Sequence, residues 1–488
     1  FRENGLDISE SNSSRFREWL RNKYKTDAAL QSAWSDKSVT LANAKVPTDL
    51  PGNISFKPEE YTLMLKSSDR KYIDYLDYIG SLVSDIIAEL STTVKNASNR
   101  ENIVIAFYGY LFELADPQSG HFGLDKLLAH KDIDGFASPE RYLDRNVNEL
   151  FPNQPAGSTG AYMSAVDSIQ RAGKMWFVES DQRTFINRAN ASTEHDSYLV
   201  PAKSVWEVQE LAKRDVGWNM LRGSAIWFMD LWSVGWLDDQ DIWNNNSRLG
   251  DLYYAYAQSQ KSMSKLDVAF VVDEQSQSLV AQPTDSAWHF LSYQRYDFYR
   301  AGISFGMYTT KDLLENKIPD AKVIFMLNPF RLNDEKVNKI LSAAKGKTLV
   351  FSYGFGETSA ANIKKLTGMD IARVDGKYSV KLTGLDGAKK FGLSSGSTYG
   401  ADVAANPRWA VTGGSDIQIA KYGDGKIGFA AKNLGTHKAV FFGGMRMSTE
   451  VIRAIMNYSG THVFSDSDDV YMANENLVVM HSSKKGVK

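Results

Sequence analysis

Apolar residues recur along the first half of the chain with two different spacings. A helical spacing predicts a long helix over 67–94, built on Ile73, Leu76, Ile79, Val83, Ile86 and Leu90. Strands are predicted at 103–108, 133–137, 174–178 and 225–231, and Met175–Val178 is a continuous apolar run typical of a strand buried on both faces. Helical patterns follow them at 122–129, 163–172, 204–220 and from about Arg248. This alternation predicts a parallel sheet with helical crossovers.

A second region of alternating strands and helices begins near Leu266. Strands are predicted at 266–274, 303–308, 323–327 and 348–353, and helices at 288–301 and 333–344. This order of elements is typical of a doubly wound, flavodoxin-like domain. Residues 378–443 are rich in strand patterns, with a hairpin turn at Asp424-Gly425, and a helix over 449–458 closes the unit. The apolar run Leu477–Met480 has no evident partner strand, which predicts a clipped β-sandwich.

The fold class expected is therefore α/β, with a partial (β/α)8 TIM barrel before the flavodoxin-like domain. Four strands do not close a barrel, since eight are needed, and an open sheet would leave unpaired edges. Either the sheet is open, or four further βα units precede Phe1, and we favour the second reading. The domains expected are 1–262 for the carboxyl-terminal half of the barrel (strands 5–8), 263–460 for the flavodoxin-like domain, and 461–488 for the start of a β-domain.

Composition narrows the possible partners. The formal charge of -2 gives no reason to expect nucleic acid, and no apolar run is long enough to span a membrane. The chain has no cysteine, which excludes disulfides, thiol catalysis and thiolate metal sites. The first residues, FRENGLDISE, show no targeting segment. The compartment therefore stays open between cytoplasm, periplasm and secretion. The 11 Trp and 23 Tyr suit sugar binding as well as an ordinary core.

The segment KMWFVESDQRT, residues 174–184, carries the main candidate for chemistry. An apolar strand leads directly into Glu179, followed by Asp181 and Arg183. Barrel enzymes keep catalytic groups at the carboxyl ends of their strands, and a buried carboxylate there needs pairing. We expect Glu179 to be a catalytic carboxylate, kept ionised by Arg183 as the nucleophile of a glycosidase requires. The alternative is a loop acid that forms a salt bridge with Arg183.

Other polar and aromatic residues follow the predicted strands. The candidates for substrate binding are His121, Tyr142, Arg145, Asp181, Arg183, Trp227 and Asp230. Trp227 could form the floor of a sugar subsite, because the apolar face of a pyranose stacks on an aromatic ring. Asp230 could equally bind a backbone amide. Glu113 is a weaker candidate.

Several blocks resemble the family 42 β-galactosidases, which are clan A glycoside hydrolases. FREWLRNKYKTDAALQSAW is similar to the segment after their acid/base strand, and DIDGFASPERYLDRN and AYMSAVDSIQRAGKMWFVESDQRT to their sixth and seventh strands. SAIWFMDLW resembles the eighth strand, and the second domain resembles their trimerisation domain, a fold related to glutamine amidotransferases. The resemblance implies a retaining β-glycosidase acting on a carbohydrate, with Glu179 as nucleophile and a homo-oligomer, trimer favoured.

Two features depart from that family. Its acid/base glutamate stands in an Asn-Glu pair, whereas here Glu3 precedes Asn4. We expect the true acid/base upstream of Phe1, with Glu3 as a weak candidate. The family's zinc cluster is missing, and neither a metal nor another cofactor is expected. An amidotransferase is excluded because that reaction needs a nucleophilic cysteine. The alternative function is a non-catalytic carbohydrate-binding or assembly protein on a degenerate or truncated barrel.

Overall fold

Within the residues that the structure describes, the first sheet is parallel and has four strands. A computed structural model describes residues 7–48, 61–114, 116–140, 161–186, 201–230, 233, 235–259, 265–281 and 288–482. The strands lie in sequential order and are β1 (Ile105–Phe107), β2 (Gly135–Pro139), β3 (Met175–Ser180) and β4 (Ala225–Phe228). Each pairs in parallel with the next. The parallel sheet expected from the sequence is therefore confirmed.

Helices connect and cover these strands. They are α4 (Leu124–Leu128), α6 (Val166–Arg171), α7 (Val205–Arg222) and α8 (Gln240–Ser259). Ser204 caps α7, where its side chain accepts from the amide of Glu207. The prediction that the last helix begins near Arg248 is wrong by two turns. Asp239 accepts hydrogen bonds from the amides of Asp241 and Ile242 and so starts α8 earlier.

Three helices at the amino-terminal end are joined through one buried carboxylate. They are α1 (Glu10–Tyr24), α2 (Asp27–Trp34) and α3 (Arg70–Ala97), the last preceded by a 3-10 turn, η1 (Ser67–Asp69). Asp74 of α3 is fully buried. It accepts from Lys23 Nζ (2.8 Å) and Tyr24 Oη (2.6 Å) of α1 and from Trp34 Nε1 (2.7 Å) of α2. Its burial is tolerated because three donors satisfy it.

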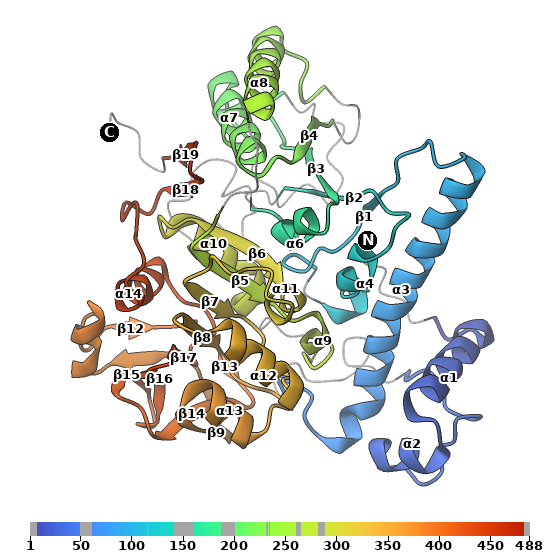
Figure 1. Ribbon diagram of the computed structural model, residues 1–488, viewed down its shortest axis with the longest axis vertical. Helices are drawn as coiled ribbons and strands as arrows, with labels where there is room; N and C mark the ends of the chain where they lie inside the picture. The colour runs from blue at the N-terminus through green and yellow to red at the C-terminus, as the bar shows by residue number, and fades with distance from the viewer. Residues whose placement is uncertain are drawn as a thin grey trace.

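The apolar face of α3 is buried along only part of its length. Ile73 and Leu76 are 1% and 4% exposed, as the helical pattern predicts. Ile86 and Leu90 are 41% and 61% exposed, and Val94 continues the same exposed stripe. The helix predicted over 67–94 is confirmed, and the second half of its apolar stripe is exposed. Figure 1 shows α3 running past the edge of the first sheet that β1 forms.

The second sheet has 11 strands in the described part of the chain and lies below the first in Figure 1. Its parallel part runs in the order β6 (Phe305–Thr309), β5 (Val268–Val272), β7 (Val323–Met326), β8 (Thr348–Ser352) and β17 (Lys438–Phe442). Numbered along the chain this is 2-1-3-4-5, the flavodoxin order. The parallel strands expected from the sequence in this region are confirmed. Its helices are α9 (Glu274–Gln277), α10 (Tyr293–Arg300) after the π-helical turn η5 (Trp288–Ser292), α11 (Thr310–Leu314), α12 (Asp334–Ala343), α13 (Ala360–Thr367) and α14 (Thr449–Ser459).

Antiparallel strands extend this sheet and fill the strand-rich region. They are β9 (Asp370–Val374), β11 (Leu382–Gly384), β12 (Thr398–Tyr399), β14 (Arg408–Gly413), β15 (Ile417–Tyr422) and β16 (Ile427–Asn433). Strands β10 (Tyr378–Ser379) and β13 (Ala404–Ala405) form a separate antiparallel pair. Two short 3-10 turns are η2 (Pro117–Ser119), between β1 and α4, and η6 (Asp386–Phe391), between β11 and β12. The hairpin predicted at Asp424-Gly425 joins β15 to β16 and is confirmed.

The last described strands form a hairpin of their own. β18 (Val470–Ala473) pairs antiparallel with β19 (Val478–His481), so the expectation that Leu477–Met480 has no partner strand is wrong. The reason is the short turn between them, in which Asn474 Oδ1 accepts the amides of Asn476 and Leu477. Val479 packs against Gly217 of α7, which fastens the hairpin to the first sheet's helical layer. Within the described residues no helix is both long and apolar enough to cross a bilayer.

Candidate active site

Glu179 shares one face of the first sheet with three aromatic residues. In the parallel register Glu179 lies beside Trp227, and Phe177 lies beside Ala225 one pleat earlier. Because side chains alternate along a strand, Phe177 and Glu179 point to the same side. The Trp227 ring contacts Phe177, with centroids 4.3 Å apart, and Phe107 at 5.9 Å. Trp176 and Val178 point to the opposite face and are buried. We call Phe107, Phe177, Glu179 and Trp227 the inner face.

This face is open at its aromatic end and closed around the carboxyl group. Phe107 is 47% exposed, whereas Glu179 is 7% exposed. Burial and the neighbouring carboxylate of Asp181 raise the pKa of Glu179 to about 7, although the positive charge of Arg183 acts in the opposite direction. The structure thus differs from the expectation that Arg183 alone keeps Glu179 ionised near neutral pH.

The position of Arg183 explains the difference. Its Nη1 binds the Asp181 carboxylate at 2.9 Å and the Asp181 carbonyl at 3.0 Å. Its guanidinium also lies over the ring of Trp236, 4.7 Å from the centroid. The charge of Arg183 is therefore largely committed to Asp181. Both residues are buried and hold the chain just beyond β3 in one conformation.

The raised pKa of Glu179 gives a stability prediction with a definite sign. A carboxyl whose pKa is higher in the folded protein than its ordinary 4.5 destabilises the fold as the pH rises from about 4.5 to 7. Glu179→Gln removes this effect. We expect the difference in free energy of unfolding, variant minus wild type, to be about 1–3 kcal/mol larger at pH 8 than at pH 5. Urea unfolding at both pH values measures this difference. An equal difference at the two pH values would contradict it.

His121 and Tyr110 form a stacked pair beside this face. The rings are 4.6 Å apart, and Tyr108 stacks on the same imidazole at 5.1 Å. His121 Nδ1 accepts from the amides of Gly109 and Tyr110, and burial lowers its pKa to about 3, so the imidazole stays neutral. Burial, followed by the charges of Glu179 and Asp181, raises the pKa of Tyr110. The Tyr110 hydroxyl therefore lies within the field of both carboxylates.

Asp230 binds backbone amides. Its Oδ2 accepts from the amides of Gly235 at 2.6 Å and Trp236 at 3.1 Å. Of the two readings that the sequence left open, the structure shows the amide contact. The candidates Tyr142, Arg145 and Glu3 lie outside the described residues.

Other carboxylates near these strand ends are held by arginines. Glu113 binds Arg295 at 2.6 Å. Glu140, which follows β2, lies 3.8 Å from Arg214 of α7 and is buried. Burial and the nearby Asp215 raise the pKa of Glu140 well above its ordinary value, while the charge of Arg214 acts in the opposite direction. Glu113 and Glu140 thus belong to the packing between elements.

Sequence reasoning missed Tyr110 and Trp236. Tyr110 lies three residues after β1, at the same edge of the sheet as Glu179, and its place after an apolar run was an available signal. Trp236 comes from a loop 53 positions beyond Arg183, and nothing in the local pattern connects it with that residue. Only the fold brings the two into contact.

No protein-family model matches the chain, and no curated protein matches it by sequence. Solved structures do match its fold. The β-galactosidase from Bacillus circulans sp. alkalophilus has a TM-score of 0.65 at 12% identity, over 96% of this chain and 70% of that enzyme. The β-galactosidase from Rahnella sp. R3 has a TM-score of 0.63 at 13% identity, over 96% and 69%.

A third β-galactosidase, from the haloarchaeon Halorubrum lacusprofundi, gives a TM-score of 0.62 at 11% identity, over 96% of this chain and 70% of that enzyme. At such low identity the match establishes a shared fold. The chain therefore has the fold of these glycoside hydrolases, and the resemblance to the β-galactosidase family stated from the sequence is confirmed at that level.

Proposed function

We propose that the protein is a retaining β-glycosidase, β-galactosidase-like, in which Glu179 is the nucleophile. One observation carries the proposal: Glu179 ends a central strand of a parallel sheet and lies beside Trp227 on its inner face. Carboxyl ends of parallel barrel strands are where such enzymes place their catalytic groups. The shared fold with solved β-galactosidases supports the substrate class.

The proposed reaction proceeds in two displacements. A carboxylate oxygen of Glu179 attacks the anomeric carbon and forms a glycosyl ester, while an acid gives its proton to the leaving oxygen. The residue that served as the acid then deprotonates a water molecule, which attacks the anomeric carbon and releases Glu179. Glu179 must be ionised to attack, and its pKa of about 7 places that form in neutral to alkaline solution. Trp227 would stack on the sugar.

We place the acid/base on a further βα unit that would complete the barrel. Two observations support an incomplete barrel in the described residues. β1 and β4 are edge strands of the first sheet, and α3 exposes Ile86, Leu90 and Val94 next to the β1 edge. Neighbouring βα units would pair with the edge strands and cover the exposed apolar residues of α3, because parallel sheets are ordinarily covered on both faces.

A mechanism-based label tests the nucleophile directly. A 2-deoxy-2-fluoro-β-glycoside with an activated leaving group slows the second displacement, so the glycosyl ester accumulates. We expect the modified peptide to contain residues 174–184 and the added mass to lie on Glu179. Modification of another carboxylate would reject Glu179 as nucleophile, and no modification together with no hydrolysis would reject the enzyme.

Trp227 gives a separate prediction about the subsite. Trp227→Ala removes the proposed stacking surface, and we expect kcat/KM for aryl β-glycosides to fall about 10- to 100-fold. Trp227→Phe keeps an aromatic ring against Phe107 and Phe177 and should recover part of the loss. Steady-state kinetics with both variants measure the effect, and circular dichroism checks the fold. Unchanged kinetics in Trp227→Ala would remove this residue from the site.

A second candidate is a carbohydrate-binding or assembly protein without catalysis. The observation in its favour is that Glu113 and Asp181 bind arginines and Glu140 is buried 3.8 Å from a third, so these carboxyl groups serve the fold. Such a protein would bind glycosides without hydrolysing them. Turnover of an aryl β-glycoside by the complete protein separates the two functions.

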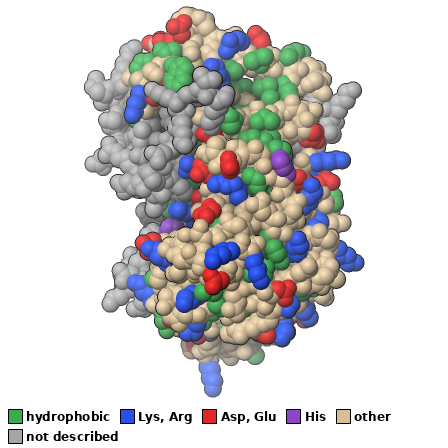
Figure 2. Space-filling model, turned by 90° about the vertical axis from the view of Figure 1, so that its left-hand side faces the viewer, with side chains coloured by type: hydrophobic (Ala, Val, Ile, Leu, Met, Phe, Trp, Pro, Cys, Tyr) green, Lys and Arg blue, Asp and Glu red, His purple; other side chains and the backbone are tan. Residues whose placement is uncertain are grey.

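The proposal includes a homo-oligomer, with a trimer favoured. The exposed large hydrophobic residues of α7, α8 and β19 suit a contact between subunits; they are Trp206, Trp243, Leu252, Tyr254, Val478 and Met480. Figure 2 shows hydrophobic side chains gathered in the upper part of the face it presents, while charged side chains dominate the lower part.

A further inference from the structure

A cavity of about 610 Å³ lies between the first helices and the flavodoxin-like domain. One side is lined by α3 and α4, through residues such as Asp77, Ser81 and Asp125. The other side is lined by the segments that follow β5, β6 and β7, through Gln275, Lys311 and Arg331, among others. Its size is that of an ordinary small-molecule site. It is built from elements other than the inner face that carries Glu179.

The topology of the second sheet places this cavity where such folds bind ligands. β5 is the first strand of the parallel part, with β6 on one side and β7 on the other. The connection that follows β5 therefore leads to one side of it, to β6, and the connection that follows β6 leads to the other side, to β7. In open α/β sheets this reversal opens a crevice at the carboxyl ends of the strands, and ligands bind there. The cavity lies at the carboxyl ends of the three strands at this reversal.

The walls offer hydrogen-bond donors and acceptors in equal measure. The positively charged lining residues are Lys126, Lys311, Arg331 and Lys336. The negatively charged ones are Asp77, Asp125, Asp273 and Glu274. Basic and acidic lining residues are therefore equal in number, and burial raises the pKa of Asp125 to about 6 and that of Glu274 well above its ordinary value. A hydroxyl group both donates and accepts, so a molecule rich in hydroxyls can use both kinds of wall.

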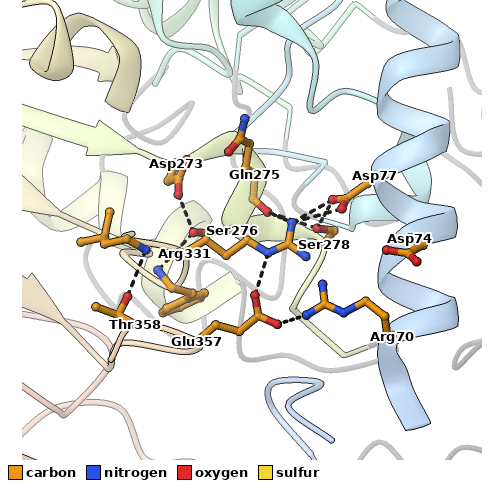
Figure 3. A network of polar contacts seen from close by, with 12 residues as sticks. Arg70, Asp74, Asp77, Asp273, Gln275, Ser276, Ser278, Arg331, Glu357 and Thr358 are labelled. Atoms are coloured by element: carbon orange, nitrogen blue, oxygen red, sulfur yellow. Dashed lines mark hydrogen bonds and ion pairs between the residues drawn. The ribbon is translucent and has the colours of Figure 1, made fainter. Parts of the chain in front are cut away.

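Several of these groups are held in place before any ligand binds. Arg331 Nη1 binds Asp77 at 2.9 Å and the Gln275 carbonyl at 2.8 Å, and Figure 3 shows its guanidinium between these residues and Glu357. Lys336 Nζ binds Gln275 Oε1 at 3.1 Å. A site fixed in this way loses little conformational freedom on binding.

Lys311 has spare capacity to bind a ligand. Its Nζ donates to the Asp125 carbonyl over a long 3.4 Å contact, and an ammonium group carries three donors. The Asp125 carboxylate accepts from Thr309 Oγ1 at 2.6 Å, which orients it beside Lys311. Trp19, Phe122 and Leu314 add apolar surface to the same cavity. Polar groups combined with apolar surface match the two kinds of face that a pyranose presents.

From this we infer that the cavity is a second carbohydrate-binding site, which takes a neutral mono- or disaccharide and performs no chemistry on it. The inference does not rest on Glu179 being catalytic. A phosphorylated ligand is the competing occupant, and it would need the positive charges to prevail over the four carboxylates.

Hydrogen–deuterium exchange of the complete protein tests the site. The probes are D-galactose, D-glucose, lactose and inorganic phosphate, each at high millimolar concentration. We expect at least one saccharide to slow exchange in peptides covering 273–278 and 310–314, and phosphate to have no effect there. Protection in Glu179→Gln should equal that of the wild type, which separates this site from the proposed active site.

Lys311→Met is the variant that tests the wall chemistry. We expect it to weaken saccharide binding about tenfold, because it removes a charged hydrogen-bond donor. Lys317→Met changes a lysine of the next segment that pairs with Glu315 and does not line the cavity, and it should bind as the wild type does. Ser81→Phe, which narrows the cavity from α3, should also weaken binding. The inference is overturned if no saccharide protects these peptides, if phosphate alone does, or if Lys311→Met binds normally.

Discussion

Glu179→Ala is expected to lower kcat for aryl β-glycoside hydrolysis by on the order of 10⁴-fold or more, because the variant has no group that can attack the anomeric carbon. The vacated space beside Trp227 can admit a small anion. Azide should therefore restore turnover and yield the α-glycosyl azide, since it attacks from the side that Glu179 occupied. If Glu179 were the acid/base, azide would give the β-glycosyl azide. Nuclear magnetic resonance of the product distinguishes the two.

Glu140→Gln is the matched control for that experiment. Glu140 follows the strand next to β3, but it is buried against Arg214 of α7, and burial raises the pKa of its carboxyl group. Glutamine has nearly the same shape as glutamate and can still contact Arg214. The variant should keep the wild-type rate. A loss as large as that of Glu179→Ala would contradict the assignment of Glu179, and so would a Glu179→Ala variant that is folded and active.

Asp74→Ala is expected to destabilise the fold by about 3–5 kcal/mol, because it removes one partner of a buried ionic network. Lys23, Tyr24 and Trp34 would each lose an acceptor that the wild type supplies within 2.8 Å. Burial and the bond to Asp74 together raise the pKa of Tyr24, so this hydroxyl stays protonated and needs an acceptor at any ordinary pH. The loss should appear first in α1 and α2.

Thermal unfolding followed by circular dichroism, together with hydrogen exchange of residues 10–34, measures this effect. Asp85→Ala is the control on the same helix. Asp85 is 57% exposed and pairs with Lys126 at the surface, and exposed pairs of this kind contribute at most about 1 kcal/mol. Asp85→Ala should therefore unfold nearly as the wild type does. Equal effects of the two substitutions would show that Asp74 does not join the three helices.

Local patterns were sufficient for the strands and for the order of the second domain. The apolar run before Glu179 marks a strand, and β3 covers 175–180 where the sequence predicts 174–178. The helix boundaries were less certain from the sequence, because caps decide them. Asp239 starts α8 ahead of the apolar pattern, and the exposed residues Ile86 and Leu90 of α3 look the same in the sequence as buried ones.

The sequence by itself determined that Glu179 ends an apolar strand with Asp181 and Arg183 close behind, since adjacency in the chain requires no folding. The tertiary structure alone decided how those charges are shared. Arg183 binds Asp181 and lies over Trp236, while burial raises the pKa of Glu179. The physical reason is that a carboxyl group's ionisation depends on its solvent exposure and on every charge within a few ångströms, and most of that surrounding comes from distant parts of the chain.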